Sequence, residues 1–187
     1  MNESLQSLLR RNSSPRLVEP APDSVSLQNM FRAALRAPDH AWLQPWRFQV
    51  ISGAARQQLG QVFLNSLLAG NPAADETARS KAQNAPLRAP MMIVVICCTS
   101  PHPKVPPQEQ LLSTGCAAHA LLLAAEAQGY AGIWRTGSYV EDTIVNKALG
   151  VADNEQIIGF LYFGSRDGAA KSLPDRKVED YVSYWPT

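Results

Sequence analysis

The stretch MMIVVICC, residues 91–98, decides the fold. It is a continuous apolar run with the length of a β-strand rather than of a helix. A run without polar alternation is typical of a strand that is buried on both faces. We therefore predict that residues 91–98 form a central strand of the sheet.

Helical and extended patterns alternate on both sides of this strand. Helices are predicted over residues 3–11, from Asp23 or Ser24 to Arg36, over 54–68, over a short stretch within 69–90, over 108–128 and over 141–149. Further strands are predicted over residues 46–52, within 129–137 and over 156–164. This order predicts an α/β or α+β sandwich with a small sheet and many helices, folded as a single domain over residues 1–187.

The composition limits the partners of this 187-residue chain. Apolar residues make up 45%, which is ample for a core, and charged residues make up 18%, below the usual quarter. The low charge indicates that part of the surface is buried against a partner. The net charge of +1 gives no overall field that would attract nucleic acid or an anionic membrane, so neither is an expected partner.

The C-terminal tail, residues 165–187, also indicates that part of the surface is buried against a partner. It is charged and contains proline, yet it ends with three aromatic residues in the sequence DYVSYW. Aromatic side chains with little core nearby indicate that the tail docks onto another surface, such as a second subunit.

The cysteines and the apolar segments predict a cytoplasmic protein. Cys97 and Cys98 are adjacent in an apolar run, which suits reduced core thiols better than a disulfide framework. The first residues show no signal-peptide pattern. The longest apolar-rich segment, residues 111–128, is interrupted by polar residues and is therefore predicted to be a buried helix rather than a membrane span.

The sequence LRAPDHAWLQPWRFQVIS, residues 35–52, contains the first candidate site. It joins the helix expected to end at Arg36 to the strand expected to begin at Trp46. The connection holds two prolines, an aspartate, a histidine, a tryptophan and a glutamine, an unusual set for a simple connector. His40 could be a base, a metal ligand or a hydrogen-bond donor, although a lone loop histidine is most often only a polar contact.

Two arginine-bearing stretches are candidate phosphate sites. RRNSSPR, residues 10–16, combines guanidinium groups with hydroxyls, which is what a phosphate needs. GIWRTG, residues 132–137, sets Arg135 and Thr136 between glycines that let a backbone approach a ligand closely. The alternatives are a solvated basic turn that caps a helix and a β-turn with a surface arginine.

The sequence lacks the motifs of other common active and binding sites. Cys116 and His119 are three residues apart, but there is no C-x-x-C pair, so no metal site is predicted. A catalytic cysteine is disfavoured because all three cysteines have apolar neighbours, which raise a thiol pKa. G-x-S-x-G, P-loop and G-x-G-x-x-G motifs are absent, so a nucleotide must be held by other means.

Taken together, RRNSSPR, APDHAWLQPWRFQVI, the alanine-rich helix and GIWRTG resemble the FMN-dependent nitroreductase family in their order and spacing. The resemblance covers residues 4–165 and is strongest to the short YdjA-like branch of NAD(P)H nitroreductases. It implies a three-layer α+β sandwich, with a small, mainly antiparallel sheet flanked by helices, in an intertwined homodimer. Two FMN molecules would lie at the interface, each touched by both subunits.

The resemblance also implies site residues. Arg11, Asn12 and Ser13 match one FMN-binding triplet, and Trp134, Arg135 and Thr136 match another. Arg11 and Arg135 would then pair with the FMN phosphate. Arg36 and His40 match loop residues that reach FMN from the partner subunit, with Pro38 and Pro45 holding that loop rigid. Many larger family members carry a basic residue four positions after the first arginine, and here that position is Pro15, with Arg16 following it.

The implied function is that of an FMN-dependent oxidoreductase. It would take hydride from NAD(P)H and reduce nitroaromatic, quinone or similar acceptors by a ping-pong mechanism. No side-chain acid or base is required, so no catalytic residue is assigned, and His40 is the candidate proton donor. The alternatives are an FMN-dependent dehydrogenase, a flavin-binding protein with incidental reductase activity, and a plain α/β domain whose arginines are surface charge.

Overall fold

The structure, a computed structural model, describes residues 2–186, so the two terminal residues of the predicted domain lie outside it. The α-helices are α1 (Glu3–Arg10), α2 (Ser24–Ala34), α3 (Ala55–Gly70), α4 (Glu76–Gln83), α5 (Pro107–Ala127) and α6 (Thr143–Ala148). The strands are β1 (Leu17–Val18), β2 (Trp46–Ser52), β3 (Met91–Cys98), β4 (Ala131–Arg135) and β5 (Glu155–Arg166). Short 3₁₀ helices are η1 (His40–Trp42), η2 (Ala85–Arg88), η3 (Ser138–Val140) and η4 (Val178–Asp180).

The five strands form one antiparallel sheet in which β3 lies between β2 and β5. The order is β1-β5-β3-β2, and β4 also pairs with β5. Seven of the eight residues of β3 are buried, as the apolar run of residues 91–98 predicts. The central strand and the α+β class with a small antiparallel sheet are therefore confirmed.

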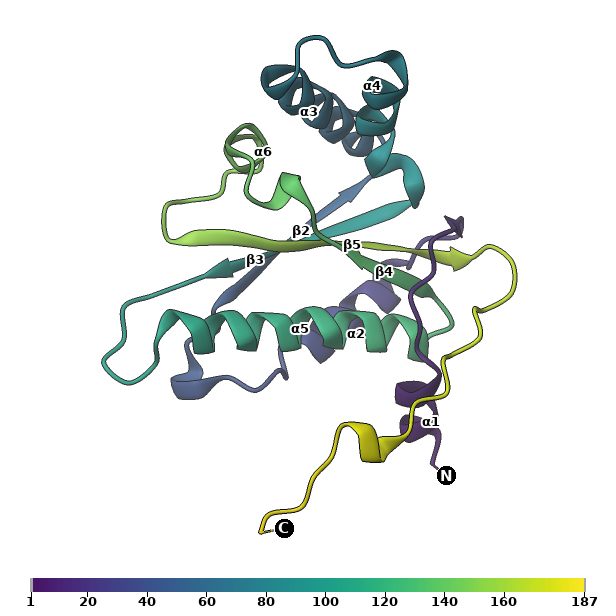
Figure 1. Ribbon diagram of the computed structural model, residues 1–187, viewed down its shortest axis with the longest axis vertical. Coiled ribbons are helices and arrows are strands. Elements are labelled where there is room, and N and C mark those ends of the chain that lie inside the picture. Colours follow the sequence, from purple (N-terminus) through teal and green to yellow (C-terminus); the bar gives the residue numbers. More distant parts are fainter. Residues whose placement is uncertain (1, 187) are drawn as a thin grey trace.

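Helices cover both faces of the sheet, which makes the fold three layers (Figure 1). Helices α5 and α2 lie on one face, here called the α5 face, and α3, α4 and α6 lie on the other, the α3 face. Each face has its own apolar core. The α5-face core includes Trp46, Ile93 and Leu121, and the α3-face core includes Phe63 and Val94.

Most element boundaries agree with the sequence prediction to within one or two residues. The largest difference is β1, which was missed because a two-residue strand has no periodicity. Side-chain caps explain why several helices begin where they do. Asp23, Asp75 and Asp142 each accept a backbone N–H of the helix that follows them.

A β-bulge next to β4 prepares the position of a predicted site residue. Val95 pairs with Gly159 but Ile96 pairs with Ile157, so β5 carries one extra residue at Ile158. The freed carbonyl of Ile158 accepts a hydrogen bond from Nε1 of Trp134 at 3.2 Å. A Cβ on residue 159 would collide with that indole, so only glycine leaves the ring its space there.

The tail runs away from the folded core in Figure 1, beyond the end of β5. Its residues 167–186 are exposed, and Tyr184 and Trp185 expose 84% and 94% of their surface. Docking of this tail on a second subunit stays a prediction. Within residues 2–186, no helix combines the length and apolarity needed to cross a membrane.

Candidate functional site

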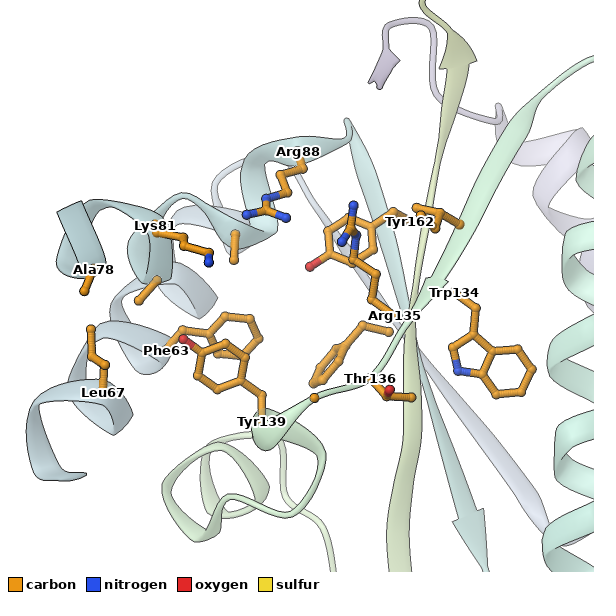
Figure 2. Close-up of a pocket in the computed structure, with 15 residues that line it drawn as sticks. Phe63, Leu67, Ala78, Lys81, Arg88, Trp134, Arg135, Thr136, Tyr139 and Tyr162 are labelled. Carbon is orange, nitrogen blue, oxygen red and sulfur yellow. The ribbon is translucent and has the colours of Figure 1, made fainter. Parts of the chain in front are cut away.

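A cavity of about 710 Å³ opens on the α3 face, between the end of β4 and helices α3 and α4 (Figure 2). We call it the Arg135 pocket. Its size is within the range of small-molecule and cofactor sites. Its lining residues are Phe63, Leu67, Ala78, Lys81, Ala82, Ala85, Arg88, Ile133, Trp134, Arg135, Thr136, Gly137, Tyr139, Phe160 and Tyr162.

Stacked aromatic rings form one wall of the Arg135 pocket. The rings of Phe63 and Tyr139 are parallel to within 7° with centroids 3.9 Å apart, and Phe160 meets Phe63 edge-on at 5.6 Å. Burial raises the pKa of Tyr139, and the charge of Asp142 raises it further, so its hydroxyl stays protonated at neutral pH. The wall is therefore apolar, uncharged and suited to a planar ring.

Arg135 is the one predicted site residue whose guanidinium enters this pocket. It lies over the ring of Tyr162, with 5.9 Å from Cζ to the ring centroid. Its Nε is buried and has no hydrogen-bond partner among the described residues. A buried charged donor without a partner is costly, and natural structures rarely keep one unless a ligand or water completes it. The Arg135 N–H is therefore placed to donate a hydrogen bond to an anionic or carbonyl oxygen of a ligand.

Two further cations stand at the rim of the pocket. Lys81 and Arg88 are exposed, and neither side chain makes a hydrogen bond or ion pair within residues 2–186. Figure 2 shows both reaching toward the opening from α4 and η2. Burial raises the pKa of Tyr162, whereas Arg135 and Arg88 lower it, so both guanidinium groups act on the same hydroxyl. Among the described lining residues there is no carboxylate, so the pocket favours negative charge.

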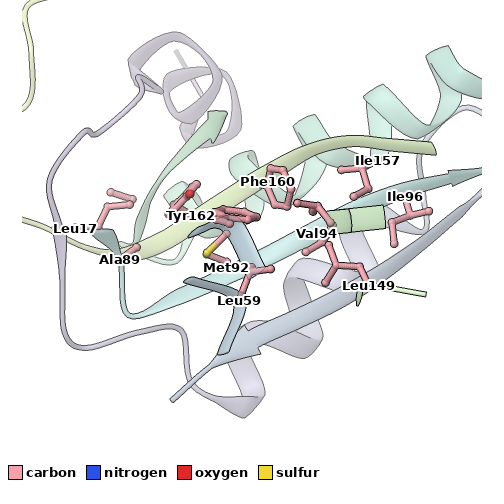
Figure 3. Close-up of a cluster of buried hydrophobic side chains, with 13 residues drawn as sticks. Leu17, Leu59, Ala89, Met92, Val94, Ile96, Leu149, Ile157, Phe160 and Tyr162 are labelled. Carbon is pink, nitrogen blue, oxygen red and sulfur yellow. The ribbon is translucent and has the colours of Figure 1, made fainter. Parts of the chain in front are cut away.

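The pocket wall continues into the α3-face core, which makes it rigid (Figure 3). Phe160 and Tyr162 of β5 pack there with Met92 and Val94 of β3, and Leu59 of α3 closes the cluster. These side chains expose 4% of their surface or less. Close packing of this kind holds the aromatic rings and the Arg135 backbone in place.

The other members of the predicted triplet 134–136 have different roles. The indole of Trp134 points away from the pocket and packs in the α5-face core (Figure 2). Thr136 is exposed at the mouth, and Gly137 follows it with a φ of 106°, which favours glycine. Trp134 therefore anchors the strand end from which Arg135 and Thr136 reach the pocket.

The predicted triplet Arg11, Asn12 and Ser13 lies outside this pocket. Asn12 accepts a hydrogen bond from Arg166 Nη1 at 2.9 Å, and Arg166 pairs with Glu126 of α5 at 3.5 Å. The triplet is thus tied to the α5 side of the sheet. One residue later, the N–H of Ser14 donates to the carbonyl of Gly132 in β4 at 3.1 Å. The N-terminal segment and β4 are neighbours, but the pairing of Arg11 with Arg135 on one phosphate stays a prediction.

The loop of residues 36–44 forms a second, smaller cavity of about 230 Å³ whose lining includes Arg36 and Pro38. His40 Nδ1 lies 2.9 Å from Glu109 Oε2 of α5, and Asp39 accepts the N–H of Gln44 at 2.7 Å. This cavity shares no residue with the Arg135 pocket.

The backbone of this loop is strained. Ala41, Trp42 and Gln44 have φ values of 63°, 56° and 48°, in the left-handed region that non-glycine residues rarely adopt. Each such residue costs about 1–3 kcal/mol, and such strain gathers at ligand clamps and active sites. The side chain of Trp42 is left 81% exposed. The strained loop therefore holds the Trp42 side chain out in solvent, where no described residue of the same chain covers it.

Several pocket residues were missed by the sequence analysis. Phe63 lies in the helix predicted over residues 54–68, and Lys81 and Arg88 lie within residues 69–90, where the sequence predicted only a short helix. Tyr139 and Tyr162 showed no motif. The available signal was weak: Tyr139 follows the RTG turn by two residues, and Lys81 and Arg88 are two cations seven residues apart.

Other titratable groups form structural contacts. Arg47 Nε and Nη2 donate to the Glu155 carboxylate at 2.7 and 2.6 Å, which holds the Glu155 pKa at about 2. Burial and then Glu155 raise the pKa of Cys98 to about 12, so this thiol is not a nucleophile. Over residues 2–186, no three His, Cys, Asp or Glu side chains gather in a way that could hold a metal ion.

Comparisons with known proteins agree with this architecture. The model of the Nitroreductase family matches residues 17–165. The Escherichia coli K12 protein named "Putative NAD(P)H nitroreductase YdjA" is 44% identical over 186 residues, which covers 98% of this chain and all of that protein. The resemblance seen in the sequence is therefore confirmed.

Solved structures show the same fold. A nitroreductase-like family protein from Bacillus cereus has a TM-score of 0.84 at 20% identity and covers all of this chain and 98% of its own. A nitroreductase with bound FMN from Bacteroides fragilis NCTC 9343 has a TM-score of 0.75 at 20% identity, covering 98% of this chain and all of its own.

Proposed function

The chain belongs to the nitroreductase family, a family of oxidoreductases, and from this premise we propose that it is an FMN-dependent enzyme that oxidises NAD(P)H and reduces nitroaromatic, quinone or similar acceptors. One observation carries the proposal. Among residues 2–186 the buried Nε of Arg135 has no hydrogen-bond partner, and it lies in a pocket with three cationic side chains and a flat aromatic wall. An anionic cofactor with a planar ring supplies what this pocket lacks.

The residues present fit FMN. Arg135 would donate hydrogen bonds to an acceptor of the cofactor, and Thr136 would add a hydroxyl or a backbone N–H at the pocket mouth. The Phe63–Tyr139 pair would stack beside a ring system. When bound, FMN would supply hydride acceptance from NAD(P)H and electron transfer to an acceptor, in two half-reactions of a ping-pong cycle.

The remaining predicted residues complete the site in a homodimer. Arg11, Asn12 and Ser13 would hold the cofactor phosphate at the edge of β4, to which Ser14 is hydrogen-bonded. The strained loop with Arg36, Pro38 and His40 would form a wall of the site of a second copy. Trp42 and Arg36 support this role, since both are exposed and the Arg36 side chain makes no hydrogen bond or ion pair with the described residues of its own chain.

The protein groups would position and stabilise rather than exchange covalent bonds. Arg135 would contribute a fixed positive charge that holds an anionic group of the cofactor. The aromatic wall excludes water from one side of the pocket. His40 is the candidate proton donor, because Glu109 holds its Nδ1 and can orient the ring.

We also place the protein in the cytoplasm. Its three cysteines are free thiols, and Cys97 is buried in β3, as expected for a reducing compartment.

The test is the visible absorption spectrum of the purified protein, before and after NADH or NADPH is added under nitrogen. We expect a flavin spectrum that bleaches on addition of reductant and returns when a quinone or nitroaromatic compound is added. A flavin spectrum that neither reductant bleaches would favour a flavin-binding protein or a dehydrogenase. Protein that takes up no flavin after incubation with FMN would refute the proposal.

A further inference from the structure

We propose that a groove along α4, lined by Thr77, Ser80, Lys81, Asn84 and Arg88, binds the 2′-phosphate of NADPH and makes this protein prefer NADPH over NADH. The inference rests on the proposed function, and it names the co-substrate that the same site takes. The groove has a volume of about 540 Å³, and Glu76, the first residue of α4, also lines it.

The groove is one face of a helix and of the turn that follows it. Residues three and four apart point the same way from an α-helix, and Thr77, Ser80, Lys81 and Asn84 have these spacings. Arg88 closes the row from η2. Local sequence alone thus aligns two hydroxyls, one amide and two cations.

The groove and the Arg135 pocket are continuous at two residues. Lys81 and Arg88 line both cavities, and Figure 2 shows them on the α4 side of the pocket mouth. A molecule whose ring reaches the mouth of the Arg135 pocket, beside the cofactor proposed to fill it, can therefore extend past these two side chains into the groove. NADPH has this form, with a nicotinamide at one end and a 2′-phosphate toward the other.

The groove offers donors that are not already used. Ser80 Oγ accepts a hydrogen bond from Asn84 Nδ2 at 3.1 Å, so the hydroxyl hydrogen of Ser80 remains available to an oxyanion. Lys81 and Arg88 have no hydrogen bond or ion pair within the described chain. Arg79 of the same helix is different, because its guanidinium donates to the carbonyls of Ala74 and Pro72. Arg79 therefore stabilises the fold, whereas the side chain of Lys81 makes no hydrogen bond or ion pair with the described residues.

A phosphomonoester is the group that this arrangement suits. It carries a charge of about −1.5 to −2 at neutral pH and three acceptor oxygens. A lysine, an arginine and a hydroxyl match that charge and that number of acceptors. The 2′-phosphate is the phosphomonoester of NADPH and is absent from NADH, so the groove discriminates between them. The FMN phosphate has the same chemistry, and the experiment separates the two sources.

The experiment compares holoenzyme of wild type, Lys81→Gln, Arg88→Gln and the double variant. We expect the NADPH-over-NADH ratio of kcat/KM to fall about five- to tenfold in each single variant, and more in the double variant, through a raised KM for NADPH. Lys147→Gln, which removes an exposed lysine from α6 on the same side of the sheet, is the matched control and should keep the wild-type ratio. An unchanged ratio in the double variant would overturn the inference.

Binding of adenosine 2′,5′-bisphosphate and of AMP, followed by calorimetry, gives a readout that needs no turnover. The bisphosphate should bind the wild type more tightly than AMP, and the double variant should lose this advantage. Equal binding of both to the wild type contradicts the inference. Titration with FMN identifies the other source: a double variant that loses FMN affinity and leaves the bisphosphate advantage intact assigns the groove to the FMN phosphate. Failure of the proposed function would appear separately, as wild-type protein without flavin.

Discussion

Two Trp–Arg pairs on the same sheet have opposite environments. Trp46 and Trp134 both pack in the α5-face core, and Arg47 and Arg135 follow them on the opposite face of β2 and β4. Arg47 donates twice to Glu155 and once to the carbonyl of Gly150, at 2.9 Å. Arg135 lies over the ring of Tyr162, and its buried Nε has no hydrogen-bond partner in the part of the chain that the structure describes.

A structural arginine differs from a binding one in whether the fold supplies its acceptor. The dipeptides are identical, so local sequence does not distinguish them. The difference is made by Glu155 at the start of β5, which reaches Arg47, whereas the described residues around Arg135 include no carboxylate. A charge that the fold leaves incomplete is a candidate for function, and a charge that the fold completes is a candidate for stability.

The largest effect is expected at the structural arginine. Arg47→Ala should lower the free energy of unfolding by about 3 kcal/mol, because it leaves the largely buried Glu155 carboxylate without its partner. Chemical denaturation at pH 7 measures the loss, and FMN affinity of the folded variant should stay near that of the wild type. A variant as stable as the wild type would show that the ion pair contributes little.

The Arg47–Glu155 ion pair predicts that the free energy of unfolding changes with pH by about 2 kcal/mol. The Glu155 pKa is lowered to about 2, first by the hydrogen bond from Arg47, so its stabilisation is complete above pH 4.5 and disappears as the pH falls through about 2. The stability difference between wild type and Arg47→Ala should therefore shrink as the pH falls. Denaturation curves between pH 7 and pH 2 test this, and a constant difference would contradict the assigned cause.

The binding arginine should give the reverse pattern. Arg135→Ala should weaken FMN binding by about 1.5–3 kcal/mol, or roughly ten- to a hundredfold, because a charged hydrogen bond to the cofactor is lost. The apoprotein should lose little stability, since no protein acceptor is left unpaired. Flavin fluorescence titration and denaturation of the apoprotein measure the two quantities. An unchanged dissociation constant for FMN would remove Arg135 from the site.

The fold could be predicted from the sequence because its signals are local. The apolar run that predicts β3 and the helical spacing that predicts α5 each lie within one continuous segment of the sequence. The exceptions have physical reasons. The strand β1 has two residues and no period to read, and α4 is a short polar helix whose start depends on the cap by Asp75.

The site could be predicted only in part because its members meet through tertiary structure. Arg135 and Thr136 were found from a glycine-bounded turn, which is a local signal. Phe63 and Tyr139 become a stacked wall only when α3 packs beside η3, and the spacing between them in sequence carries no information about that contact. The triplet of residues 11–13 and the loop of residues 36–40 lie in separate places in one chain, so a second copy is needed to judge them.

The loop of residues 36–40 provides the smallest expected effect. Arg36 is exposed and has no hydrogen bond from its side chain in the described structure, so Arg36→Ala should weaken FMN binding by only about 1 kcal/mol, roughly fivefold. Arg32→Ala removes an exposed arginine from the last turn of α2, just before this loop, and should leave FMN affinity unchanged. Mixed dimers of Arg36→Ala and Arg11→Ala subunits then decide where Arg36 acts. If it reaches the partner's site, each mixed dimer keeps one site with wild-type affinity and one with both defects, and titration is biphasic. Two sites that each carry a single defect, with no site of wild-type affinity, would place Arg36 in the site of its own chain and assign the strained loop a different role.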